Sequence, residues 1–274
     1  MTVAAVDLVN HALTLLGQST ITALTDNDRN ARTANQIYEQ VRDGVVSAHP
    51  WYEAIRRSDL VRAFETVTVT SGVWSSGNTQ ITFEVSGTTL SGASYDVSSG
   101  NSVTIDSVSP TAYDATYRVT SVSGSTFVVE EDDDPGTYVS GGTMIRVPAF
   151  HFDHYYDLPD DFMRLHKPED LQWDYRIEDD YLVTSETEVG IRYVKQMTDV
   201  DAMSPQLRGV IIAKLAMDMS LRLTGSDSTR DRMEKLYKDA LMDAQFIDCS
   251  QEPVDQMIGS TWLNSHISGG QIWR

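Results

Sequence analysis

The sequence has little of what marks secreted, membrane-spanning or disulfide-rich proteins. Cys249 is the only cysteine among 274 residues, so the chain has no internal disulfide and no cluster of thiolate metal ligands. No apolar run reaches the roughly 18 residues that span a bilayer. The first residues also lack the basic segment of a secretion signal. These absences predict a protein without a membrane partner that is soluble and folds in a reducing cytoplasm.

Basic residues are scarce as well. The chain has 21 Lys and Arg against 40 Asp and Glu, which gives a formal net charge of −19. Tight binding to nucleic acid depends mainly on Lys and Arg that neutralise phosphates, so a DNA-binding module is not expected. An acidic protein can still line a passage through which DNA moves without sticking.

Motifs for catalysis are missing too. The sequence has no G-x-S-x-G elbow, no phosphate-binding Walker loop and no H-E-x-x-H pair. His49 stands before Pro50 and is interpreted as a helix-end group, and Cys249 as an inert thiol. We therefore predict that the protein is not an enzyme, and we assign it no catalytic residue, cofactor or metal.

Two short stretches leave a metal-binding alternative open. His151 and His154 lie three residues apart, close to Asp153, Asp157 and two further aspartates at 160 and 161. The plainer interpretation is a polar loop that leads into a strand. The acidic run 130–134 precedes a turn and is interpreted as solvated, with a calcium site as the alternative.

The stretch 28–51 predicts an amphipathic helix. It begins at a cap formed by Asp26, Asn27 or Asp28, and Pro50 ends it. Its apolar residues recur at intervals of three and four and should face the core: Ala34, Ile37, Tyr38, Val41, Val45 and Ala48. Its polar side carries both signs of charge and is predicted to meet a neighbouring subunit through Arg29, Arg32, Glu39, Arg42 and Asp43.

Three more helices follow from the same kind of pattern. One covers 3–16, with Thr2 as its cap. Another covers 205–224, with Pro205 at its first position and Gly225 at its end. The last starts near Ser228 and runs to 248. Helices near both ends of the chain predict a four-helix bundle.

The middle of the chain has a different composition. Residues 66–148 contain no lysine and many Ser and Thr, with glycines between short β-branched runs. Six strands are predicted from these runs: VTVT, QITFEV, SVTIDSV, TYRVTSV, TFVVEE and TMIRV. So many short strands in about 80 residues indicate a compact β-sandwich or a small barrel.

The composition reverts after Phe150. A hairpin, WDYRI–EDD–YLVTS, and a third strand, VGIRYVK, are predicted before the paired C-terminal helices. The fold class is therefore α+β. Residues 1–65 and 149–248 form a discontinuous helical core with a small β region, 66–148 an inserted all-β module, and 249–274 an extended C-terminal arm.

The arm has no helical period but is rich in apolar residues, which disordered tails usually lack. We predict that it docks on a neighbouring subunit or a partner, because aromatic anchors are favoured at interfaces. The alternative is that it folds back on its own helices. The predicted docking residues are Met257, Ile258, Trp262, Leu263, Ile267, Ile272, Trp273 and Arg274.

Four stretches resemble the tail tubular protein A family, the head–tail adaptors of short-tailed bacteriophages. They are NHALTLLGQSTITALTD, the run from Ala31 through YEQVRDGVVSAHPW, DLPDDFMRL with the hairpin YRIEDDYLVT, and IRYVKQMTDVDAMSP before the paired helices. The segment VTIDSVSPTAYDATYRVTSVSGSTFVVEEDDDPG is similar to β-modules inserted in phage structural proteins. Those modules commonly have Asn-Gly where this chain has Asp114-Ala115, so the turn there is expected to differ.

The resemblance implies a structural virion protein that assembles in the host cytoplasm and ends in the phage neck. It implies a homo-oligomeric ring, expected to have twelve subunits, that docks under the portal protein. The ring would receive the tail nozzle, a tubular protein B-like partner, and leave a channel for DNA. The module at 66–148 would be available to tail fibres.

A second hypothesis comes from another class. The Ser/Thr-rich region around Trp74 would suit a carbohydrate- or fibre-binding tail protein that acts through the β insertion. Deletion of 66–148 distinguishes the two hypotheses, because an adaptor should keep its portal binding.

Overall fold

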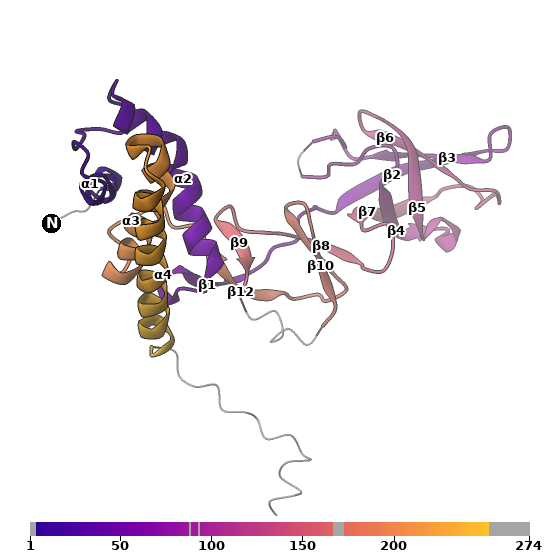
Figure 1. Ribbon diagram of the computed structural model, residues 1–274. Helices are drawn as coiled ribbons and strands as arrows, with labels where there is room; N and C mark the ends of the chain where they lie inside the picture. Colours follow the sequence, from indigo (N-terminus) through magenta and orange to yellow (C-terminus); the bar gives the residue numbers. More distant parts are fainter. Residues whose placement is uncertain (1–3, 88, 93, 167–172, 252–274) are drawn as a thin grey trace, which may run out of the picture. The chain divides into compact units, whose positions relative to one another are not determined.

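The computed structural model describes residues 4–87, 89–92, 94–166 and 173–251. Within these ranges the protein is a mixed α and β fold with four helices and a closed six-stranded β-barrel. The chain divides into two compact units (Figure 1). The helical unit comprises Met1–Ile55 and Val194–Arg274, and the β unit comprises Arg56–Tyr193.

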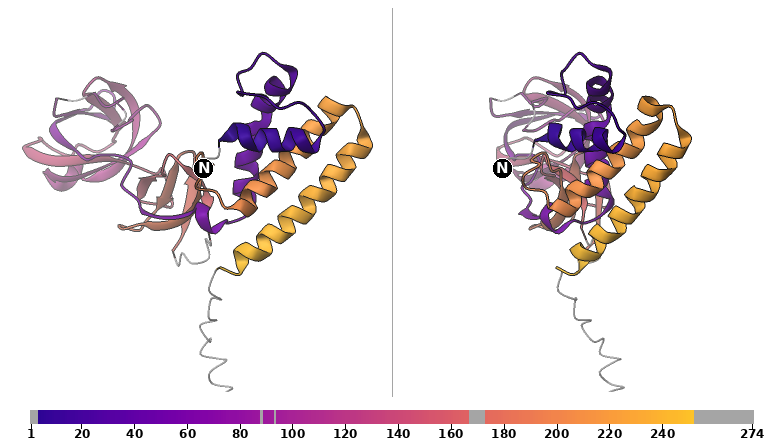
Figure 2. Two further views of the ribbon diagram at one scale, coloured as in Figure 1. Left: turned by 90° about the vertical axis from the view of Figure 1, so that its left-hand side faces the viewer. Right: turned by 60° about the vertical axis from the view of Figure 1, so that its left-hand side comes forward.

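The helical unit is organised around its third helix. Helices α1 (Ala5–Leu15) and α2 (Arg29–Ala48) come from the start of the chain, and α3 (Pro205–Thr224) and α4 (Asp227–Cys249) from its end. Helix α3 packs against the other three and lies between α1 and α4 (Figure 2). It can do so because its buried residues lie on several sides, whereas α4 buries only a narrow strip at Met233, Ala244 and Asp248.

The helix ends of α2 and α3 confirm the sequence prediction. The side chain of Asp28 accepts a hydrogen bond from the backbone N–H of Asn30, and the helix ends at His49, before Pro50. The hydroxyl of Ser204 accepts from the N–H of Leu207, and Gly225 ends α3 in the left-handed region, at φ 65°.

Two other helix starts were predicted wrongly. Helix α4 is capped by Ser226, whose hydroxyl accepts from the N–H of Thr229 at 3.3 Å, and not by Ser228. Helix α1 follows Ala4, whose N–H donates to Asp7 Oδ2 at 2.8 Å, and the predicted cap at Thr2 lies outside the described residues. In α4, Ser226 can satisfy the free backbone N–H groups of the first turn as well as Ser228 can. In α1, Asp7 inside the first turn accepts from the backbone N–H of Ala4. The residue pattern alone therefore did not identify the capping residue of either helix.

All six strands predicted in the middle of the chain are present. They are β2 (Val67–Ser75), β3 (Gln80–Val85), β4 (Ser102–Ser109), β5 (Ala115–Ser123), β6 (Thr126–Glu130) and β7 (Ser140–Val147). They form a closed barrel in the order β2-β3-β6-β5-β4-β7, so the barrel alternative is correct and the sandwich is not. Antiparallel pairing of β2 with β7, with Val67 opposite Met144, closes the barrel and brings its two chain ends together.

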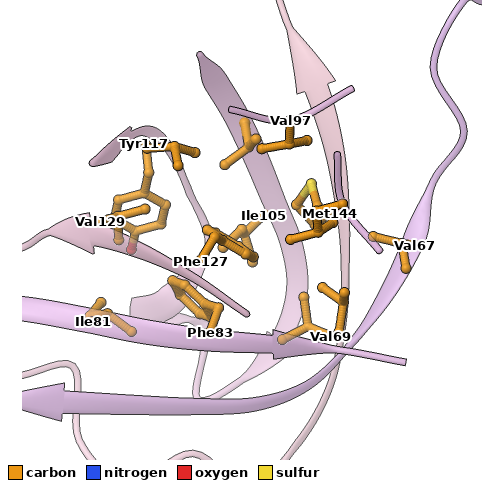
Figure 3. Close-up of a cluster of buried hydrophobic side chains, with 14 of the residues drawn as sticks. Val67, Val69, Ile81, Phe83, Val97, Ile105, Tyr117, Phe127, Val129 and Met144 are labelled. Atoms are coloured by element: carbon orange, nitrogen blue, oxygen red, sulfur yellow. The ribbon is translucent and has the colours of Figure 1, made fainter. Parts of the chain in front are cut away.

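The barrel interior is filled by side chains that alternate along the strands. Phe83 and Phe127 are fully buried and stack with their ring centroids 5.2 Å apart (Figure 3). Ile105 and Met144 point into the same interior. Burial of each such side chain contributes roughly 1.5–3 kcal/mol before conformational entropy is subtracted.

The remaining strands form two small sheets in the orders β1-β12-β9 and β10-β11-β8. Their bounds are β1 (Ile55–Asp59), β8 (His154–Asp157), β9 (Phe162–Leu165), β10 (Tyr175–Glu178), β11 (Tyr181–Thr184) and β12 (Gly190–Lys195). The predicted hairpin is confirmed as β10 and β11. The predicted third strand, β12, pairs in the other sheet, with β1 and β9.

The boundary between the two units differs from the predicted domain boundary at 65 and 149. Residues 56–65 and 149–193 group with the barrel, not with the helices. One physical reason is the guanidinium of Arg146 on β7, which lies 4.5 Å from the ring centroid of Phe64 and 5.5 Å from that of Tyr155.

Candidate interaction surfaces of the helical unit

The polar side of α2 is only partly available to a neighbour. Arg29, Arg32 and Glu39 are exposed, as predicted. Arg42 is not, because only 7% of it is accessible and its Nε donates to Asp43 Oδ1 at 2.7 Å. This hydrogen bond to Asp43, opposed by burial, raises the pKa of Arg42.

The Arg42–Asp43 pair therefore belongs to the fold of the helical unit. Asp43 is half-buried and also accepts from Gln196 Nε2 at 2.8 Å. Arg42 further lies 5.9 Å from the ring centroid of Tyr38. Arg42, predicted to meet another subunit, has little surface available for such a contact, because its long side chain bends back onto its own helix. Ala48, predicted to face inward, is exposed.

The N-terminal end of α2 is tied to the C-terminal end of α3. Nη2 of Arg29 donates to the carbonyl oxygen of Arg222, and Nη1 of Arg222 donates to Gln36 Oε1 at 2.7 Å. Both arginine side chains are exposed, so their positive charges remain accessible to solvent at this end of the helical unit.

The opposite end of α2 is joined to α4 by a buried carboxylate. Nε2 of His49 donates to Asp248 Oδ2 at 2.8 Å, and the backbone N–H of Tyr52 donates to Oδ1 at 3.0 Å. Trp51 is 1% exposed, and its Nε1–H donates to the carbonyl oxygen of Val45 at 3.0 Å. His49 was predicted from the sequence to be a helix-end group, and it is also one half of this link.

A groove runs over α3 between α2 and α4, and we call it the α2–α4 groove. Its volume is about 620 Å³, within the roughly 300–1,000 Å³ of ligand-sized pockets. Its lining mixes apolar and charged side chains from the three helices: Ile37, Gln40, Val41, Gly44, Val45, Lys214, Met217, Asp218, Leu221, Arg230 and Tyr237.

Helix α4 also exposes apolar side chains near its C-terminal end. Met242 is 63% exposed, Phe246 78% and Ile247 38%. The exposure of these three residues was not predicted from the sequence. Their spacing of four and one residues, off the buried strip, was a signal for a second apolar surface.

The eight predicted docking residues of the arm, from Met257 to Arg274, lie outside the described residues. Helix α4 ends at Cys249, which is exposed, so the arm follows directly on its exposed apolar end.

The fold does not provide a set of metal ligands at either candidate metal site, the stretch 151–161 or the acidic run 130–134. The described residues contain no group of three or more His, Cys, Asp and Glu side chains that could hold a metal ion. Nε2 of His154 instead lies 3.2 Å from Nη2 of Arg62, which donates to it. Burial first, and the charge of Arg62 second, lower the pKa of His154.

The β unit has a polar and aromatic hollow of about 380 Å³. It is lined by Phe150, His151, Phe152, Asp174, Arg176 and Glu178. Phe150 is 73% exposed there. Trp74, by contrast, packs against the barrel core and donates its Nε1–H to the carbonyl oxygen of Glu131 at 3.0 Å, so it is no exposed platform.

In the part of the chain that the structure describes, no helix is long and apolar enough to cross a membrane. No model of a known protein family matches the sequence, and none of the curated proteins compared with it matches either. The adaptor resemblance therefore stays a prediction, and the surfaces described above provide the structural basis for a functional proposal.

Proposed function

We propose that this chain is a structural subunit of a ring that joins the head of a short-tailed bacteriophage to its tail. In this proposal the helical unit is a four-helix bundle core and packs beside its copies under the portal protein. The tail nozzle binds below, and the genome passes through the centre. The role is structural and not catalytic.

The observation that carries the proposal is the exposed apolar end of α4. Met242, Phe246 and Ile247 lie in water in the isolated chain, and the apolar arm follows them. Contiguous exposed apolar residues mark interaction sites more often than single ones do. A subunit whose partners are other virion proteins would cover this surface.

The composition also supports the proposal. A net charge of −19 gives a ring of such subunits a field that repels phosphate. DNA could then move through the channel without binding to it, and no base-reading element would be required.

The β-barrel suits an accessory role. Its chain ends meet at the β2–β7 pair, so it can be removed with a short linker while the helical unit keeps its own core. We propose that it faces a neighbouring tail component such as a fibre.

Electron microscopy of the purified protein mixed with the portal protein of the same phage tests the proposal. The expected result is a ring of this chain docked on the portal. Images that show only single copies, with none bound to the portal, would contradict it. The same experiment on a chain without 66–148 should still give a docked ring.

A carbohydrate- or fibre-binding protein is the alternative proposal, and the hollow beside Phe150 favours it. An exposed aromatic ring next to Arg176 and Glu178 is an arrangement that can stack on a sugar and bind its hydroxyl groups. Glycan-array binding that disappears in Phe150→Ala, with no portal binding by the intact chain, would favour this alternative over the adaptor.

A further inference from the structure

We infer that the exposed end of α4 in one copy of this chain lies in the α2–α4 groove of the next copy. The inference rests on the proposed ring and specifies the two surfaces through which neighbouring subunits would join. Both surfaces belong to the helical unit, and they are different parts of it.

The first surface is one face of α4, which we call the α4 stripe. It consists of Asp239, Met242, Asp243, Phe246 and Ile247, whose spacing of three and four residues places them side by side along the helix. All five are exposed. Such an amphipathic helix face is the usual ligand for a groove between helices.

The second surface is the α2–α4 groove. Its floor is apolar, with Val41 and Val45 from α2 and Met217 from α3. Leu221 at its edge is 46% exposed. Apolar side chains of the stripe would remove this surface from water, which is favourable in proportion to the area covered.

Charge selects a second copy as the occupant. Asp239 and Asp243 form no ion pair among the described residues, and neither does Arg230 in the groove. The other two charged residues of the groove, Lys214 and Asp218, neutralise each other at 3.0 Å. The stripe is therefore acidic and apolar, and the groove offers it an apolar floor and an arginine. Opposite charges favour this pairing and its rate of formation.

The same charges disfavour a symmetric contact. Two stripes placed face to face would bring Asp239 and Asp243 against the same residues of the second copy, and like charges across an interface are costly. A contact between the α4 stripe of one copy and the α2–α4 groove of the next is instead head-to-tail. Such a contact repeats from copy to copy, and it closes into a ring when the rotation between neighbouring copies is a whole fraction of a full turn.

A mixing experiment tests the inference. Phe246→Glu alters only the stripe and Leu221→Glu only the groove, and both residues are exposed enough that the fold should tolerate the change. Assembly is measured by mass photometry and electron microscopy, on the protein alone and on the portal. Each variant alone should associate with its own copies more than about tenfold more weakly than the natural chain.

An equal mixture of the two variants should recover one contact and give dimers but no closed ring. In that dimer the intact stripe of the Leu221→Glu chain lies in the intact groove of the Phe246→Glu chain. A control with matched exposure, Val61→Glu in the β unit (74% exposed), should assemble like the natural chain. A charge reversal, Arg230→Asp with Asp243→Arg, should assemble better than either single reversal.

Other results overturn the inference in distinguishable ways. Normal rings from both single variants would show that subunits join elsewhere, while the proposed ring survives. Assembly that is lost in Phe246→Glu but kept in Leu221→Glu would indicate a symmetric contact between two stripes. Loss of assembly in both variants, with no dimers in the mixture, would show that the stripe does not bind in the groove. Assembly that is lost on truncation after Gln251 but kept by Phe246→Glu would place the arm in the groove. A natural chain that forms no contact with its copies, alone or on the portal, would overturn both this inference and the proposed function.

Discussion

His49 and Asp248 lie 199 residues apart in the sequence, yet Nε2 of His49 is 2.8 Å from Asp248 Oδ2. The carboxylate is 6% exposed and accepts a second hydrogen bond, from the N–H of Tyr52. This link connects the end of α2 to the last turn of α4, immediately before the arm. It adds a polar link to the packing of α1 and α2 on α3, which joins the first 55 residues to the C-terminal helices.

Loss of this carboxylate should destabilise the helical unit. Asp248→Ala removes the acceptor of the Tyr52 N–H and of His49 Nε2, and a lost hydrogen bond to a charged group costs about 1.5–3 kcal/mol. Denaturant unfolding followed by far-UV circular dichroism would measure this loss. Asp231→Ala, an exposed aspartate on the same helix, should change the free energy of unfolding by less than about 0.5 kcal/mol. Equal effects of the two changes would show that the link contributes little.

The barrel should depend strongly on its stacked phenylalanines. Phe83→Ala removes a fully buried ring and leaves a cavity, which typically costs about 3–5 kcal/mol. Tryptophan fluorescence from Trp74 during denaturant unfolding would measure the change in the β unit. Val73→Ala on the outside of the same barrel, at 61% exposure, should change the free energy of unfolding by less than about 0.5 kcal/mol.

One glycine of β7 should not tolerate a side chain. Gly142 has φ of 106°, a backbone conformation that L-residues rarely adopt, and an added Cβ would collide with the side chain of Val108. Gly142→Ala should therefore lower the melting temperature of the barrel more than Gly124→Ala. Gly124, at φ 60°, has open space around an added Cβ, so only backbone strain of about 1–2 kcal/mol is expected there. A smaller effect at Gly142 would contradict the packing argument.

The β unit should lose stability on mild acidification through His154. A histidine whose folded pKa is lowered adds stability that is fully present above its unfolded pKa of about 6.5 and is lost as the pH falls below it. The reason is that protonation would place a positive charge in a partly buried site and beside the positive charge of Arg62, whose hydrogen bond to Nε2 would also be lost. Denaturant unfolding at pH 7.5 and at about pH 5.5 should show a smaller loss for His154→Gln than for the natural chain. His11→Gln on α1 should leave the pH dependence of the β unit unchanged.

Local pattern in the sequence was enough for most individual elements. Alternation of apolar residues predicted the six barrel strands. A cap at one of residues 26–28 and the stop at Pro50 predicted the bounds of α2. These features depend on residues within a few positions of one another, and their physics is local. For the same reason the hairpin of β10 and β11 was predictable from its own turn.

Pairing and burial were decided by tertiary structure. The pattern of VGIRYVK predicts a strand. Its partners could not be predicted, because β1 precedes the barrel strands in the sequence and β9 follows them. The choice between sandwich and barrel depended on the pairing of β2 with β7, which no local signal specifies. The unit boundary likewise follows from contacts such as Arg146 on Phe64.

The candidate surfaces likewise depend partly on local sequence pattern and partly on tertiary structure. The sequence by itself determined which faces of the helices are apolar and where charge is concentrated, because periodicity and composition are properties of the chain. Only the tertiary structure decided that Arg42 is buried, and that Met242 and Phe246 stay exposed while α3 is covered on several sides. A helix face is buried only when another element reaches it, and α4 packs chiefly against α3 and so keeps its outer apolar face in solvent.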